Sequence, residues 1–113
     1  MLERTTRVNL LYDFYEALLS NKQREVFELY YHDDWSLGEI AEKLQVSRQG
    51  VYDIIKRSEK ALENFESKLG LYHTYCKNEI ITRQIGKIVD DSQLTSNTKI
   101  EIMKLVKNLQ MND

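Results

Sequence analysis

The chain has 113 residues, of which 42% are apolar and 30% are charged, and its 16 basic and 18 acidic side chains leave a formal charge of -2. This length fits one domain with one core, to which a helical appendage could be attached. The charge balance excludes a global attraction to polyanions, so any nucleic-acid contact must be local. Because the chain has no proline and only four glycines, turns are scarce and an all-α fold is expected.

Several classes of protein are disfavoured by what the sequence lacks. No run of about 18 apolar residues and no apolar segment after a basic start occur, so we expect a cytoplasmic protein without a membrane span. Cys76 is the only cysteine, which rules out an intramolecular disulfide, and it is expected to be a buried filler in a helix. We find no Gly-rich phosphate loop, metal-ligand cluster or Ser/His/acid set, so neither an enzyme nor a cofactor is expected.

The N-terminal half predicts two helices. Apolar residues recur at three- and four-residue steps from Glu3 to Leu19, the spacing of one helical face. Ser20 and Gln23 have the spacing of a capping box, in which each side chain bonds the other residue's backbone N–H. A second helix should therefore start after Ser20 and run to about His32.

A helix-turn-helix is predicted next. Ser36 with Glu39 repeats the capping-box spacing ahead of a short apolar helix, and only Gln45 and Val46 separate that helix from a new N-cap, Ser47. The following helix should run from Arg48 to Leu69, where Gly70 can end it. Three small or branched residues stand where such a corner packs, namely Ala41, Val51 and Ile54. Trp35 is expected to anchor the corner.

Two further helices should follow. Residues from Leu71 to Val89 keep a helical stripe, although Gly86 weakens it by about 1 kcal/mol relative to Ala. His73 and its tyrosine neighbours there are expected to serve packing rather than ligand binding. Thr95 or Ser96 then caps a last helix, whose apolar positions are Ile102, Leu105, Val106 and Leu109. We divide the chain into a helix-turn-helix domain, residues 1–70, and a C-terminal helical extension, residues 71–113, treated as one globular unit.

One face of the predicted second motif helix carries hydrogen-bonding side chains that would meet a major groove. Candidate DNA contacts are Arg48, Gln49, Tyr52, Asp53 and Lys56, with Arg57 and Lys60 extending a positive strip. Ser36 and Ser47 are candidates for positioning phosphates. Paired-helix corners also occur in proteins that never touch DNA, and an exposed polar face is usually just solvated.

The run from Leu19 to Leu62 resembles region four of bacterial sigma factors and, more broadly, winged-helix-superfamily DNA-binding bundles. The residues that carry the likeness are Gln23-Arg24-Glu25-Val26-Phe27, Leu29-Tyr30, Ser36, Glu39-Ile40-Ala41, Leu44 and Val46-Ser47-Arg48. The resemblance implies that Arg48, Gln49 and Asp53 contact DNA. Housekeeping sigma factors tend to carry Glu and Gln at the positions of Gln49 and Asp53. An unpaired Asp53 would repel phosphate and could accept only from a cytosine amino group.

The whole chain, and not only this run, is similar to the YlxM family, small proteins like sigma region four from low-GC Gram-positive bacteria and mycoplasmas. The matching segments are Asn9, Leu11, Tyr12-Asp13-Phe14-Tyr15, Leu18-Leu19, Glu28-Leu29-Tyr30-Tyr31, Asp34-Trp35-Ser36 and Val46-Ser47-Arg48-Gln49-Gly50-Val51-Tyr52-Asp53. The match is specific from the N-terminus through about Leu71 and loose after it. The resemblance implies a DNA-binding regulator linked to the signal recognition particle pathway, because the family's genes lie beside those for that particle's GTPase and receptor.

Charge leaves a second reading open. From Asn21 to Leu62 there are seven basic and eight acidic residues, so binding to DNA should be weak for a monomer. The alternative is an accessory protein that binds the GTPase of the signal recognition particle and does not bind DNA specifically.

An apolar seam along the long helix predicts a homodimer. The seam runs through Val51, Ile55, Ser58, Leu62, Phe65 and Leu69 at steps of three and four. Packing within the chain and a subunit interface are equally compatible with it. We expect the interface to include Leu62, Phe65, Leu69, Tyr72 and Tyr75, because two copies of a weak helix-turn-helix gain affinity on paired half-sites.

Overall fold

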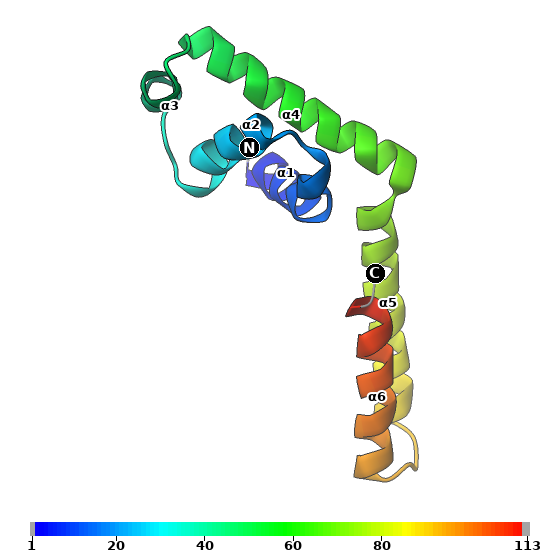
Figure 1. The fold of residues 1–113 in the computed structure, drawn as a ribbon. Coiled ribbons are helices and arrows are strands. Elements are labelled where there is room, and N and C mark those ends of the chain that lie inside the picture. The colour runs from blue at the N-terminus through cyan, green and yellow to red at the C-terminus, as the bar shows by residue number, and fades with distance from the viewer. Residues whose placement is uncertain (1, 112–113) are drawn as a thin grey trace. The chain divides into compact units, whose positions relative to one another are not determined.

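A computed structural model describes residues 2–111, which form six α-helices and two short irregular helical turns and contain no β-strand (Figure 1). The expected all-α class is therefore confirmed. In chain order the elements are α1 (Leu2–Tyr15), η1 (Glu16–Leu18), α2 (Asn21–Phe27), η2 (Glu28–His32), α3 (Leu37–Leu44), α4 (Arg48–Leu69), α5 (Leu71–Asp90) and α6 (Ser96–Met111). Within that described range no helix is both long and apolar enough to cross a bilayer.

The predicted helix boundaries on either side of the motif are confirmed by their caps. Ser20 Oγ accepts from the Gln23 N–H at 3.1 Å while Gln23 Oε1 accepts from the Ser20 N–H at 3.0 Å. The Ser36 and Glu39 pair repeats the same reciprocal bonds. The Ser36 N–H bond lowers the pKa of the Glu39 carboxyl, because it favours the charged form. Gly70 ends α4 with a φ of +61°.

Two segments differ from the expected regular helices. The first helix stops at Tyr15 rather than Leu19, because the chain tightens into the 3₁₀ turn η1 and Leu19 is already extended, with ψ of 155°. At the end of the second helix the chain widens into the π turn η2, in which the Asp33 N–H donates to the Glu28 carbonyl at 3.0 Å. π turns are rare and shift the side chains that follow them around the axis.

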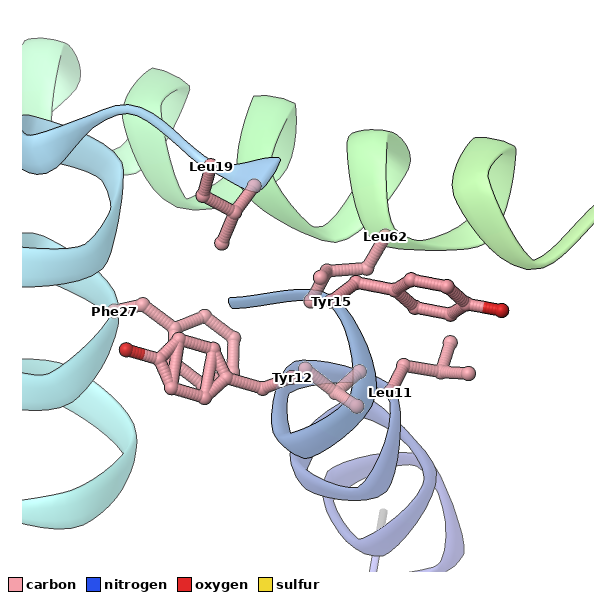
Figure 2. Packing of buried hydrophobic residues seen from close by; sticks show 7 residues of the cluster. Leu11, Tyr12, Tyr15, Leu19, Phe27 and Leu62 are labelled. Carbon is pink, nitrogen blue, oxygen red and sulfur yellow. The ribbon is translucent and has the colours of Figure 1, made fainter. Parts of the chain in front are cut away.

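Residues 1–72 form one compact unit and residues 73–113 form another. The first unit holds two buried clusters. One cluster packs α1 and α2 against α4, with the Tyr12 and Phe27 rings stacked at 4.3 Å (Figure 2); its buried members are Val8, Leu11, Tyr12, Tyr15, Leu19, Phe27 and Leu62. The second cluster fills the helix-turn-helix corner and is built from Val26, Ile40, Ala41, Val51 and Ile55.

Each of three core tyrosines donates a hydrogen bond from its hydroxyl to a carboxylate. Tyr12 donates to Glu28, Tyr31 donates to Glu59, and the Tyr15 hydroxyl donates to Glu66 Oε1 at 2.6 Å. Burial raises the pKa of Tyr15, since an apolar environment disfavours the phenolate. These bonds remove the cost of burying a phenol without a partner.

The same Tyr15 and Glu66 side chains also satisfy the start of α5. The Leu71 N–H donates to the Tyr15 hydroxyl and the Tyr72 N–H donates to Glu66 Oε1, both at 3.0 Å. The first N–H groups of a helix have no partner within it. The α4 to α5 junction at Gly70 is therefore tied to the core of the first unit.

The second unit is a helical hairpin in which α5 and α6 lie side by side and run antiparallel (Figure 1). Gln110 Nε2 donates to Glu79 Oε1 and Lys99 Nζ donates to the Asp90 carbonyl, both at 2.9 Å. The Thr98 N–H donates to Thr95 Oγ1, which makes Thr95 the cap of α6. Val89 is the only buried residue across 73–110. Because this core is so thin, Cys76 is half-buried rather than the buried filler we expected.

Candidate nucleic-acid interface

The helix-turn-helix is formed by α3, a three-residue turn and the first turns of α4. Gln45 occupies the left-handed region with φ of 55°, at a small steric cost that glycine would avoid. The corner residues Ala41 and Val51 are buried, and Ile54 and Trp35 are half-buried against the same cluster. The expected packing of the corner is confirmed, and it leaves the outer face of α4 open.

The candidate DNA contacts fall on that outer face. Arg48, Gln49, Tyr52, Arg57 and Lys60 are exposed, while Asp53 and Lys56 are half-buried. Tyr52 keeps 44% of its surface in contact with solvent, an unusual fraction for a large aromatic residue that serves only packing. The structure therefore brings all seven candidates to one side of one helix.

Some of these side chains are already engaged. Gln49 Nε2 donates to Asp53 Oδ1 at 3.0 Å, so the Asp53 carboxylate has a hydrogen-bond partner, and that partner is a neutral amide rather than a cation. A Gln amide four residues earlier lies within reach on the same helical face. Lys56 Nζ lies 3.4 Å from Glu59 Oε1 and 5.4 Å from the centre of the Tyr52 ring. Gln49, Asp53 and Lys56 would have to exchange these contacts to meet a ligand.

The Arg48 side chain reaches across the corner toward α3 and does not point directly away from α4. Its guanidinium covers Gly38 in the first turn of α3, so closely that a Cβ placed on Gly38 would stand 2.7 Å from Nη2 and 3.1 Å from both Cζ and Nε. Arg48 forms no ion pair or hydrogen bond with the described part of the chain. Its donors are therefore left for a ligand.

Arg57 and Lys60 complete the set of cations. Neither makes an ion pair with any residue of the described range. Lys60 and Lys56 also line an open pocket between α1 and α4 together with Arg7, Val8, Glu59 and Glu63. Arg7 is held there by Glu63, with Nε to Oε1 at 2.8 Å. This bond lowers the pKa of the Glu63 carboxyl, because it favours the charged form.

Both serines proposed to position phosphates act as helix caps. Ser47 Oγ accepts from the Gly50 N–H at 2.9 Å, and Ser36 caps α3 as described above. Each hydroxyl is exposed and keeps its own proton for a further acceptor. They cap the two helices of the motif, α3 and α4.

The expected dimer contacts are not gathered on one surface. Leu62 is fully buried by its own chain and has no surface to offer to a second copy. Phe65 and Tyr72 are half-buried, with ring centres 5.9 Å from Tyr15 and 6.1 Å from Phe14. Leu69 and Tyr75 are exposed. Residues of α1 and α2 therefore cover most of the seam on α4. The expectation that Leu62 contacts a second copy of the chain is wrong.

Gly38 was missed by sequence reasoning. A signal was present, since a glycine in the first turn of a well-capped helix weakens that helix relative to Ala. A glycine at such a place can mark a close approach by another group.

Together, the two capped helices, the left-handed turn residue, the buried corner and the outer face of α4 define a helix-turn-helix protein. The family described as "Putative helix-turn-helix protein, YlxM / p13 like" matches residues 2–106, and the chain belongs to this family, also called UPF0122.

Individual relatives can be aligned with this chain along nearly the full length of both sequences. A UPF0122 protein of Halalkalibacterium halodurans is 50% identical over 96% of both chains. Another, of Streptococcus suis, is 48% identical over 95% of this chain and 94% of its own. One of Anoxybacillus flavithermus is 47% identical over 97% of both.

Proposed function

We propose that this protein is a regulatory double-stranded-DNA-binding protein that uses the outer face of α4. The observation that carries the proposal is a set of three cations without an ion-pair partner within the described residues, Arg48, Arg57 and Lys60. Arg57 and Lys60 are exposed on that face, and the Arg48 guanidinium lies beside it, over Gly38 of α3. The corner beside them is packed as a helix-turn-helix, whose second helix enters the major groove while the first crosses the backbone. Exposed Tyr52 adds an aromatic edge at the level of the bases.

Affinity should come mainly from the phosphate backbone. Lysine and arginine contacts to phosphate release counterions and carry little sequence information. Asp53 and Gln49, which could read base edges, are bonded to each other. Modest sequence preference and strong salt dependence are the expected signature.

Removing two of the unpaired cations tests this proposal. The double substitution Arg57→Gln with Lys60→Gln should weaken duplex binding at low salt by about tenfold or more, because two phosphate contacts are lost. Fluorescence anisotropy with a labelled duplex measures it. Lys104→Gln with Lys107→Gln removes the same charge from exposed positions of α6 and should leave binding nearly unchanged. Equal losses for the two pairs would show that net charge rather than the α4 face sets the affinity.

We further propose a homodimer formed through the hairpin. On α5 the exposed Ile81 and Ile88 are spaced as one helical stripe with half-buried Ile85, and on α6 the exposed Leu105 and Leu109 form another with half-buried Ile102. Since both helices are right-handed and run antiparallel, these positions place the two stripes on the same side of the hairpin. The six isoleucine and leucine side chains then form one aliphatic face.

A second copy of the chain fits that face. An uncharged aliphatic surface does not attract a polyanion, and a contiguous exposed apolar patch commonly marks a protein interface. A two-fold axis would lay the same patch against itself, so that two hairpins close into a four-helix bundle. Two linked helix-turn-helix units would then compensate for weak binding by each.

The second candidate function is an accessory that binds the GTPase of the signal recognition particle. The Lys56 and Glu59 pair favours it, because it neutralises one cation of the groove face. The Gln49 and Asp53 bond favours it too, because it occupies two side chains that would otherwise be open to base edges. Calorimetric titration with that GTPase separates the two: binding that survives loss of Arg48 and Lys56 supports the accessory role. Undetectable heat with the GTPase, beside measurable DNA binding, would remove it.

A further inference from the structure

Arg48 has a position that the outer face of α4 does not require. Its guanidinium lies over Gly38 on α3, and all three of its atoms nearest to Gly38 fall within about 3 Å of where a Cβ would stand. Because Gly38 has only a hydrogen atom where other residues have a Cβ, there is room for the guanidinium. A planar guanidinium lying on glycine is held by contact alone and keeps its five N–H donors unbonded.

This place is where a helix-turn-helix contacts the DNA backbone. The first helix of the motif crosses the phosphates while the N-terminal residues of the second helix reach the base edges. Although Arg48 belongs to the second helix, its charged group is carried back to the first turn of the first helix, the turn that Ser36 caps.

We infer that Arg48 binds a backbone phosphate rather than a guanine base, and that Gly38 is the positioning residue that holds it there. This inference rests on the proposed DNA binding. It differs from a contact to a base edge in the major groove, which the place of Arg48 among the candidate DNA contacts suggests. Arg48 then adds affinity to every duplex and discriminates among none.

Gly38→Ala is the decisive variant, because it should separate binding from stability. The new Cβ displaces only the end of a flexible side chain, and Ala is the better helix former, so α3 should be at least as stable. Thermal denaturation checks this, with Gly86→Ala as the matched control: there a Cβ would meet Met103 Cε at an ordinary 3.5 Å, far in sequence from the proposed DNA face.

Binding is then measured by anisotropy against several duplexes of different sequence over a range of salt. Arg48→Ala and Gly38→Ala should each weaken every duplex by the same factor, about fivefold, and make the slope of log affinity against log salt less negative by about one. The double variant should bind no more weakly than Arg48→Ala alone, because the two substitutions remove the same phosphate contact. Gly86→Ala should bind like the wild type.

Three outcomes would overturn the inference. Gly38→Ala that binds like the wild type removes the positioning role, and Arg48→Ala that weakens one sequence much more than the others assigns Arg48 to a base. In both cases the wild-type protein still binds, so the proposed function stands. A wild-type protein that binds no duplex at low salt would overturn the inference and the proposed function together.

Discussion

Leu62→Ala is expected to destabilise the first unit by about 3 kcal/mol, without dissociating a dimer. The side chain is fully buried between α1 and α4 (Figure 2), and truncating a buried leucine removes apolar contacts and leaves a cavity. For a unit of this size such a loss lowers Tm by about 12 °C or more. Thermal denaturation followed by circular dichroism measures the shift.

Leu69→Ala is the matched control on the same helix. Leu69 keeps 55% of its surface exposed, so its truncation should cost well under 1 kcal/mol. Sedimentation equilibrium on both variants completes the test. A Leu62→Ala protein with unchanged Tm but the mass of a monomer would show that the seam of α4 is a subunit interface after all.

Ile88→Asp combined with Leu105→Asp should convert the protein from dimer to monomer. Each change puts a charge into the aliphatic face, where Ile88 and Leu105 are 71% and 63% exposed in the single chain. Burying an unpaired carboxylate in an apolar interface costs far more than the interface can offset locally. Sedimentation equilibrium at micromolar concentration should give 13.4 kDa for the variant and twice that for the wild type.

The same chemistry on the other side of the hairpin provides the control. Ile80→Asp with Ile100→Asp alters two residues that are as exposed, at 58% and 64%, but that helical spacing places on the opposite side. This pair should remain dimeric. A wild-type chain that sediments at 13.4 kDa, or equal dissociation by both pairs, would remove the hairpin interface.

Local chemistry made much of the fold predictable. The capping pairs at Ser20 and Ser36 can be recognised from a few neighbouring residues, and they mark the N-termini of α2 and α3 where expected. Gly70 ended α4 for a similarly local reason, its freedom to take positive φ. The π turn at Glu28–His32 was not predicted, because no residue pattern in the sequence marks it; in the structure Tyr31, which lies in this turn, donates to Glu59.

The site could be predicted only in part, since periodicity places residues on a face without saying what they touch. The outer face of α4 follows from its spacing alone. Whether Asp53 is bonded to Gln49 depends on rotamers, and the meeting of Arg48 with Gly38 depends on the angle at which α3 and α4 cross. The apolar seam shows the same limit, because its spacing cannot tell whether α1 or a second chain covers Leu62.

The salt dependence of duplex binding by the wild-type protein tests the central claim most directly. Three cations without an ion-pair partner in the described chain, Arg48, Arg57 and Lys60, should each release counterions from one phosphate. Log affinity should therefore fall against log salt with a slope of about -3 per helix-turn-helix engaged. Affinity that is undetectable at low salt, or that does not change with salt, would contradict a DNA-binding role for the outer face of α4.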